Sequence, residues 1–245
     1  MERMSLNHRM DRNPLYVLIH SPLVGSLTWH LVARELENRG LKAITPTLTD
    51  DSNSDLPFCQ QHAKSFAKSL ERIDIDQRVV MVAHSGAGPL LPILRQSIEQ
   101  LVISYVFVDA GVPLNGASRL DLIGQSDSQW ADQFHQALLR GESFPNWDED
   151  DLSEEIPDAS LRRRMVSELQ PRALDFYIEP IPVFAGWPDA PCAYIQFTAS
   201  YDWDCQLAEQ AGWRVRKFHA GHFHMLVDPM SVTDMILHTL SIRTT

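Results

Sequence analysis

A serine within a run of small residues is the first group in this chain that could do covalent chemistry. The run Ala83–Gly88 (AHSGAG) follows directly on the apolar stretch Arg78–Val82. A strand that turns tightly into a helix around a nucleophilic serine needs small residues two positions before and two positions after it, and both positions here are alanine. We therefore predict that Ser85 is a nucleophile at a helix N-terminus, where the N–H of Gly86 can stabilise an oxyanion.

Such a serine needs a base, and the base needs an acid that orients it. The loop between the last predicted strand and the last predicted helix supplies three candidates for the base, His219, His222 and His224. His222 follows Gly221, which fits the mobile loop that such a base occupies, so we expect His222 to be the base. A metal site built from these histidines is not expected, because they lack helical spacing and an obvious carboxylate partner.

The elements that must position these residues are six short apolar runs that alternate with helical patterns. The predicted strands are Leu15–His20, Lys42–Thr45, Arg78–Ala83, Val102–Asp109, Cys192–Thr198 and Trp213–Phe218. The predicted helices between and after them are Trp29–Arg39, Leu56–Ile73, Pro89–Leu101 and Pro229–Ile242. This alternation predicts an α/β protein with a mostly parallel six-stranded sheet and helices on both faces.

Residues 112–190 interrupt the alternation. Two helical patterns, Gln129–Leu139 and Ser160–Leu169, lie in this proline-rich segment together with many aromatic residues. We predict a core of residues 14–111 and 191–245, with 112–190 as a cap over the carboxyl edge of the sheet. The aromatic side chains are expected mainly to pack the cap on the core, and some to line an apolar pocket. Eight acidic residues between positions 142 and 158 are expected to form a solvated surface; steering of a cationic substrate is the alternative.

The composition limits the class of protein. A chain of 245 residues with 44% hydrophobic residues can bury one sizeable core, and its net charge of −11 argues against nucleic acid or an anionic membrane as partner. Its three cysteines form no CxxC pair, which favours a reducing cytosol over a disulfide framework. Residues 1–13 are polar and charged rather than signal-like, and no stretch reaches the length of a membrane span. We therefore expect a cytoplasmic protein with a small-molecule partner.

With these features the chain resembles the α/β-hydrolase superfamily, in which the nucleophile, the acid and the histidine follow in that order. The resemblance runs from Leu15 to Leu240 and rests on Leu18–His20, Ala83–Gly88, Gly221-His222 and Asp228-Pro229. The stretch from His20 through Gly25 to Trp29 is similar to the branch of small capped esterases that includes plant methyl esterases and hydroxynitrile lyases. The whole chain also looks like bacterial α/β-hydrolase-fold proteins of unassigned substrate.

The acid has two candidate positions. In this family the acid usually follows the penultimate strand, where the expected slot falls near Ser200, two residues before Asp202. A second arrangement, which resembles haloalkane dehalogenases, places the acid after the strand that follows the serine, and Asp109 ends that strand. We prefer Asp109 narrowly over Asp202, with Asp204 third; for Asp109, a role in capping a strand-end turn is the alternative.

The oxyanion hole departs from the family pattern. Its second donor is normally the N–H two residues after His20, and that residue is Pro22, which has no N–H. Loss of one donor costs roughly 3–4 kcal/mol, on the order of a thousandfold in rate. The N–H of Leu23 or the hydroxyl of Ser21 could replace it. Hydroxynitrile lyases resemble the chain here, with threonine at the Ser21 position, but they carry a lysine where this chain has Phe223.

These observations predict a serine hydrolase that cleaves a carboxylic ester, thioester or lactone through an acyl-enzyme on Ser85, with no cofactor and no metal. His222 would move the proton, and Asp109 or Asp202 would hold the imidazole. The acyl substrate is expected to be apolar or aromatic. The alternative, which Pro22 motivates, is a hydrolase fold recruited for a lyase or cyclase reaction or for ligand binding.

Overall fold

The central feature of the structure, a computed structural model that describes residues 13–51 and 53–241, is one parallel sheet. Its strand order is β2-β1-β3-β4-β5-β6. The strands are β1 (Leu15–Ile19), β2 (Lys42–Ile44), β3 (Val79–Ser85), β4 (Val102–Ala110), β5 (Cys192–Gln196) and β6 (Arg214–Lys217). This sheet confirms the predicted fold class.

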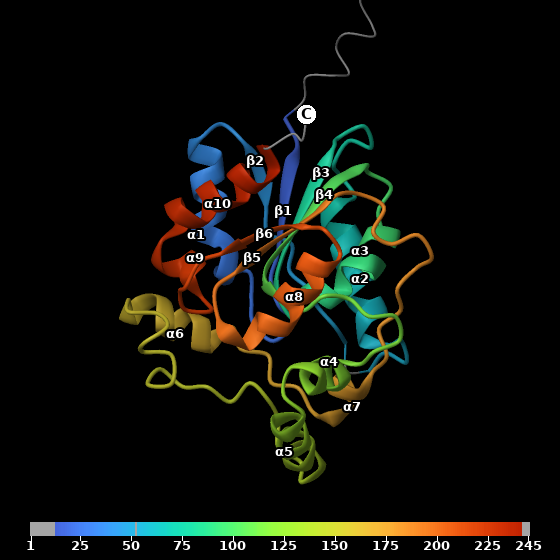
Figure 1. Cartoon of the computed structure of the whole chain (residues 1–245), viewed down its shortest axis with the longest axis vertical. Helices are drawn as coiled ribbons and strands as arrows, with labels where there is room; N and C mark the ends of the chain where they lie inside the picture. Colours follow the sequence, from blue (N-terminus) through green and yellow to red (C-terminus); the bar gives the residue numbers. More distant parts are fainter. Residues whose placement is uncertain (1–12, 52, 242–245) are drawn as a thin grey trace, which may run out of the picture.

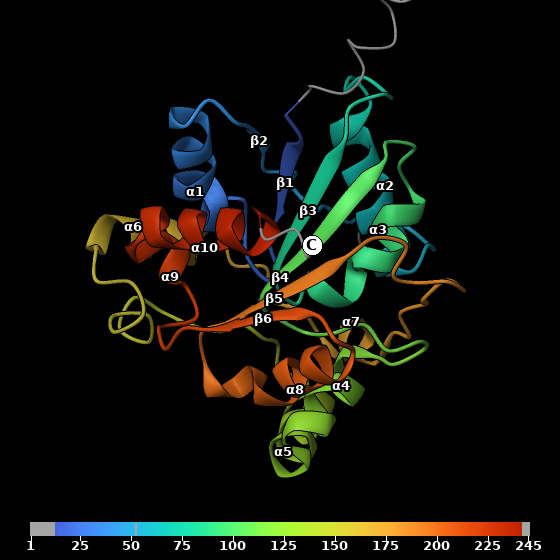
Figure 2. The ribbon, with the colours of Figure 1, turned by 45° about the horizontal axis from the view of Figure 1, so that its top comes forward.

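Helices cover both faces of the sheet, as Figure 2 shows for α1 and α10 on one side and α2 and α3 on the other. One face carries α1 (Leu27–Asn38), α9 (His224–Val227) and α10 (Pro229–Ser241). The other carries α2 (Phe58–Leu70), α3 (Leu91–Gln96) and α8 (Asp202–Gln210). Successive side chains of β3 enter the two apolar clusters in turn, with Met81 on one side and Val80 and Val82 on the other. A strand buried on both faces must be apolar throughout, which is why the strand runs do not alternate with polar residues.

The segment between β4 and β5 forms the remaining helices. They are α4 (Arg119–Ser126), α5 (Ser128–Leu139), α6 (Ala159–Ser167) and α7 (Leu174–Ile178). Figure 1 shows α4, α5 and α7 together beyond the carboxyl ends of the strands, whereas α6 lies beside the α1 face. Met165 of α6, with Leu152 and Ile156 before it, belongs to the same apolar cluster as α1 and α10. The segment therefore packs in part as a layer over the strand ends and in part as an extension of the core.

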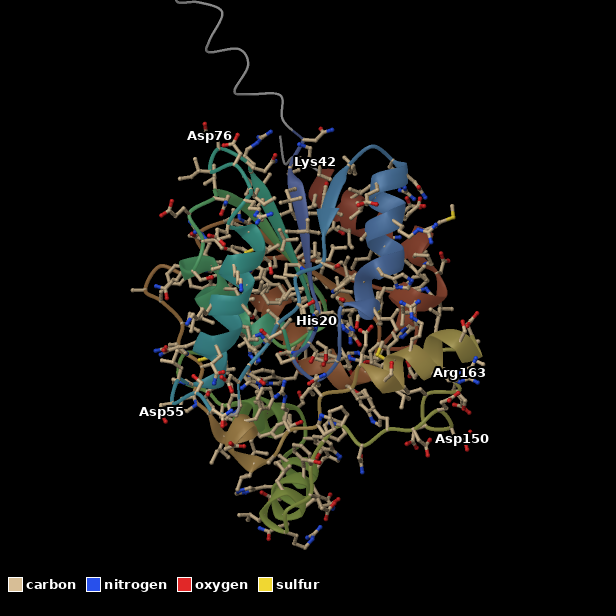
Figure 3. The ribbon with its side chains drawn as sticks, turned by 180° about the vertical axis from the view of Figure 1, so that it is seen from behind. His20, Lys42, Asp55, Asp76, Asp150 and Arg163 are labelled. Atoms are coloured by element: carbon tan, nitrogen blue, oxygen red, sulfur yellow. The ribbon has the colours of Figure 1, made fainter. Side chains whose placement is uncertain are left out.

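The surface of this segment carries the acidic run. Asp148, Asp150 and Asp151 are exposed, and the Asp148 carboxylate accepts hydrogen bonds from the N–H groups of the other two. Figure 3 shows Asp150 and Arg163 at the periphery, away from His20 near the centre of the molecule. None of the described helices is both long enough and apolar enough to cross a bilayer. A cytoplasmic location stays a prediction.

Candidate active site

Ser85 ends β3 in a left-handed conformation, with φ 57°. The chain turns at once, because the N–H of Ala87 donates to the carbonyl oxygen of His84 at 3.0 Å, and a short 3-10 turn begins at Gly88. A side chain at Gly88 would collide with the carbonyl oxygen of Gly111, just after β4. This close approach explains the glycine at position 88.

Asp109 is an extra residue in the adjacent strand. His84 pairs with Val108 and Ser85 pairs with Ala110, so that β4 bulges at Asp109, whose φ is 44°. A bulge redirects a side chain at the end of a strand. Here it brings the Asp109 carboxylate, which is fully buried, beside the end of β5.

Three groups at the end of β5 hold this carboxylate. Its Oδ1 accepts hydrogen bonds from the N–H of Phe197 at 2.8 Å and the N–H of Thr198 at 2.9 Å. Its Oδ2 accepts a hydrogen bond from the Thr198 hydroxyl at 2.8 Å. The side chain is thus fixed from the strand next to its own.

His222 completes the acid–imidazole pair. It lies in the turn between β6 and α9, and its Nδ1 is 2.7 Å from Oδ2 of Asp109. Because an aspartate oxygen accepts, Nδ1 carries the proton and Nε2 is left as the acceptor, which is the tautomer that a general base requires. The side chain of His222 is 20% exposed, so the imidazole is not sealed from solvent.

The two other candidate acids do not contact His222. Asp202 is exposed and accepts a hydrogen bond from the Gln196 amide. Asp204 is buried and accepts from the N–H of Val112 at 2.6 Å. Burial raises the pKa of the Asp204 carboxyl to about 7. Of the three acids named from the sequence, the structure therefore brings Asp109 to the histidine.

Two aromatic rings fix the position of His222. His84 is fully buried and burial lowers its pKa well below the usual value, so its neutral Nε2–H donates to the carbonyl oxygen of His222 at 3.0 Å. The Tyr201 ring stacks on the His222 ring at 5.5 Å between centroids and 9° between planes. The Tyr201 hydroxyl is also 3.0 Å from Oγ of Ser85.

The loop after β1 lies against the serine turn. Ser21 is buried, its Oγ accepts a hydrogen bond from the N–H of Leu23 at 3.3 Å, and a Cβ at Gly86 would lie 2.9 Å from that oxygen. His20 holds the start of the loop: the N–H of Leu48 donates to its Nε2 at 3.2 Å, so its Nδ1–H donates to the Ser21 carbonyl at 2.8 Å.

Residues of the inserted segment hold the same loop from outside. Arg172 donates to the Pro22 carbonyl at 3.3 Å and to Asp50 at 2.9 Å. Glu168 accepts from the N–H of Leu27, at the start of α1, at 2.9 Å, and it covers Gly25, where any side chain would collide with it. The glycine of the His-to-Trp motif therefore makes room for a carboxylate that caps α1.

The residues selected from the sequence meet in two groups, with Asp109 on His222 and with Leu23 and Gly86 against Ser21, and Tyr201 links His222 to Ser85. The structure places His224 elsewhere, with its ring against Phe197 and Phe218. Sequence reasoning missed Tyr201 and Thr198, although both lie in the stretch that was searched for an acid. Their roles are visible only in their contacts with Ser85 and Asp109, because a tyrosine or a threonine in this stretch is not by itself a sign of a site residue.

Comparison with known proteins now gives the family. The family model described as "Alpha/beta hydrolase family" matches residues 16–233. The chain belongs to the alpha/beta hydrolase family. It is 24% identical over 251 residues to a carbendazim hydrolyzing esterase of Nocardioides sp. (strain SG-4G), which covers 90% of this chain and 97% of that protein.

A plant protein and a solved structure are also similar to the chain. Methylesterase 1 of Arabidopsis thaliana is 30% identical over 108 residues, and the match covers 42% of this chain and 41% of the plant protein. The chain thus matches about two fifths of the length of that relative. An extracellular alpha/beta-hydrolase from a Paenibacillus species superimposes with a TM-score of 0.74 at 17% identity, covering 92% of this chain and 98% of the other, which shows the shared fold. The esterase names among these relatives support a hydrolase.

Proposed function

We propose that this protein is a serine esterase, and one observation carries the proposal. The hydrogen bond of 2.7 Å between His222 and Asp109 forms at the strand end where Ser85 stands in its tight turn. Such a pair gives an imidazole the right tautomer and stabilises it once it is protonated. The relatives named as esterases support the same reaction.

The proposed reaction proceeds through an acyl-enzyme. Ser85 Oγ attacks the acyl carbon of an ester, thioester or lactone, its proton goes to Nε2 of His222, and the carbonyl electrons move to the oxygen. The intermediate collapses as the bond to the leaving group breaks and His222 returns the proton to that group. Water then repeats these steps on the acyl-enzyme and frees Ser85.

The oxyanion would be held by the N–H of Gly86 and the hydroxyl of Ser21. Pro22 supplies no N–H, and the N–H of Leu23 already donates to Oγ of Ser21. The Ser21 hydroxyl proton has no acceptor among the described residues, and this oxygen lies against Gly86. The Leu23 hydrogen bond leaves Ser21 free to donate in place of the missing backbone group.

The acyl group that fits this site is apolar. Leu23, two residues after Ser21, packs in an apolar cluster with Phe58 of α2 and with Phe134, Phe176 and Tyr177 of the inserted segment. Side chains of this kind exclude water from a site that closes over its substrate. We therefore propose a small aliphatic or aromatic ester as the substrate class.

Labelling with a fluorophosphonate probe tests the nucleophile. We expect one label per chain in the unchanged protein, no label in Ser85→Ala, and unchanged labelling in Ser69→Ala, which alters an exposed serine of α2. His222→Asn and Asp109→Asn should slow labelling by about 10³- to 10⁴-fold. An unchanged protein that is folded but takes up no label would refute the proposal.

Pro22 supports a second candidate, a hydrolase fold recruited for a lyase or cyclase reaction or for ligand binding. The observation is the missing N–H at a position that other members use as an oxyanion donor. Pro22→Ala restores that N–H and separates the two candidates through turnover of p-nitrophenyl esters. A sharp rise in turnover would favour the second candidate, and unchanged turnover would show that another donor, such as Ser21, already serves hydrolysis.

A further inference from the structure

The Tyr201 side chain touches both groups that exchange a proton in the proposed reaction. Its hydroxyl is 3.0 Å from Oγ of Ser85, and within the described residues this is the hydrogen bond that the serine side chain makes. Its ring lies parallel to the imidazole of His222 at 5.5 Å. Because the ring stacks on His222 and the hydroxyl contacts Ser85, the hydroxyl lies at the oxygen that would react.

The position of Tyr201 is fixed by the segment that holds the acid. Tyr201 ends a short 3-10 turn, Ala199–Tyr201, which directly follows the two residues that bind Asp109, Phe197 and Thr198. Any movement of this segment would shift the acid and the phenol together. The backbone that carries the phenol is therefore tied to the acid, and the contacts with Ser85 and His222 place the ring.

The Tyr201 hydroxyl acts as a hydrogen-bond donor, because it keeps its proton. Burial, with a further contribution from the nearby Asp109 carboxylate, raises the pKa of Tyr201 well above its ordinary value. The hydroxyl thus keeps its proton at every pH at which a histidine base works. A serine oxygen can accept one hydrogen bond while it donates another, so Ser85 can accept from Tyr201 while it gives its own proton to His222.

We propose that Tyr201 is a catalytic residue whose hydroxyl donates a hydrogen bond to Oγ of Ser85 whenever that oxygen carries developing negative charge. This inference rests on the esterase function proposed above. In acylation the Oγ–H bond breaks, its proton goes to Nε2 of His222, and the new Oγ–C bond forms while Tyr201 stabilises the oxygen. In deacylation the Oγ–C bond breaks, Oγ takes its electron pair and then the proton from His222, and Tyr201 stabilises the departing oxygen. Tyr201 keeps its own proton throughout.

Two variants of Tyr201 separate the hydroxyl from the ring. Tyr201→Phe removes the hydroxyl and keeps the stack on His222, whereas Tyr201→Leu removes both. Tyr105→Phe is the matched control, because it also removes a buried phenol hydroxyl, but one that donates to Asp189 near the amino end of β4. Each variant is compared with the unchanged protein by melting temperature and by the second-order rate of fluorophosphonate labelling, in which the Oγ–P bond forms and fluoride leaves.

We expect Tyr201→Phe to label roughly ten- to a hundredfold more slowly than the unchanged protein, at an unchanged melting temperature. Tyr105→Phe should label at the unchanged rate. With p-nitrophenyl acetate, Tyr201→Phe should slow both the burst of nitrophenolate and the turnover that follows, because the hydroxyl serves both steps. Tyr201→Leu should be slower still.

The inference would be overturned if Tyr201→Phe labelled within twofold of the unchanged protein, whether or not Tyr201→Leu was impaired. Impairment of the leucine variant alone would assign Tyr201 a purely stacking role. Should the phenylalanine variant prove unstable, a folded leucine variant that labels at the unchanged rate would overturn the inference equally. Failure of the esterase proposal itself would look different, because the unchanged protein would then take up no label on Ser85.

Discussion

The Asp109 carboxylate receives three hydrogen bonds from Phe197 and Thr198 before His222 adds a fourth. With each oxygen accepting two bonds, the carboxylate has little freedom to rotate, so the imidazole is held in one orientation. Both Ser85 and Asp109 adopt a positive φ, which costs on the order of 1–3 kcal/mol for a non-glycine residue. The packing of β3 on β4 offsets this strain at the two ends that carry the chemistry.

Asp204 gives a prediction for the pH dependence of stability. Burial raises its pKa from 3.8 to about 7, so the folded state keeps this proton to a higher pH than the unfolded state. As pH rises from about 4 to about 7, the unfolded state loses the proton first, and this group makes the protein progressively less stable. Asp204→Asn removes the titration and can still accept from the N–H of Val112.

We therefore expect the free energy of unfolding of Asp204→Asn to rise, relative to that of the unchanged protein, as pH increases from 5 to 7. The rise is at most about 1.4 kcal/mol per pH unit, and the difference between the two proteins becomes constant above pH 8. Urea unfolding at several pH values measures it. A difference that stays the same from pH 5 to pH 9 would contradict this assignment.

The sequence predicts some of these residues for physical reasons and leaves others open. Ser85 stands out because a tight turn demands small neighbours, and that demand is local. The choice between Asp109 and Asp202 depends on the bulge in β4, which no residue type marks. The contact between Tyr201 and Ser85 joins residues 116 positions apart, which only the folded chain brings together. The catalytic roles themselves stay predictions until labelling tests them.

Among the elements, the 3-10 turn that follows β3 approaches the end of β4 so closely that it leaves no room for a side chain at Gly88. Gly88 lies so close to the carbonyl oxygen of Gly111 that a Cβ would collide with it. A side chain at position 88 would force the backbone at Gly111 to move, and a strand end moves less easily than the tip of a flexible side chain. The position of the serine turn on β4 thus depends on one glycine.

We expect Gly88→Ala to destabilise the protein by about 1–3 kcal/mol and to slow labelling of Ser85, because the shift moves the turn. Gly124→Ala in α4 is the control, since its Cβ would make only an ordinary contact of 3.6 Å with Ala131. Alanine favours helices, so the control should be neutral or more stable by up to about 1 kcal/mol. Thermal unfolding and the labelling rate measure both effects. Equal behaviour of the two variants would be inconsistent with the close approach.

The strands are the elements that the sequence predicts best, with bounds within about two residues. Burial on both faces demands continuous apolar runs, and this demand is visible without the fold. The helices α4, α7, α8 and α9 were not predicted, because each has at most nine residues and so short a segment shows little helical period. For α4 a signal existed: Ser118 and Asp121 form a capping box at its start.

At the scale of the whole molecule, Phe176 is one of the residues through which the inserted segment packs on the core. Phe176 of α7 packs edge-on against Phe58 of α2 at 5.4 Å between ring centroids, and against His62 at 6.3 Å. The guanidinium of Arg119 lies 3.7 Å from the centroid of the same ring and donates to the Phe176 carbonyl at 3.0 Å. The layer over the strand ends therefore shares its apolar contacts with α2.

We expect Phe176→Ala to cost about 3–5 kcal/mol and to loosen this layer before the sheet. Amide hydrogen exchange should rise in α4, α5 and α7 well before it rises in β3 and β4. Phe66→Ala, which removes a fully buried ring of α2 from the core, is the matched control and should raise exchange in the sheet as well. The same exchange pattern in both variants would show that the layer and the sheet open together.

The place of the acid on β4 has a consequence for redesign. The nucleophile and the acid come from the neighbouring strands β3 and β4. In the chain between β5 and α8, the residues that donate hydrogen bonds to Asp109 are Phe197 and Thr198. Of the residues that follow, Tyr201 contacts both His222 and Ser85. We expect its neighbours Ala199 and Ser200 to be exchangeable without separating the acid from its histidine. Libraries at these two positions would leave Tyr201 and the acid–histidine pair in place, whereas exchange of Asp109 in β4 would remove the pair. The turn after β5 is thus the natural place to evolve new selectivity in this protein.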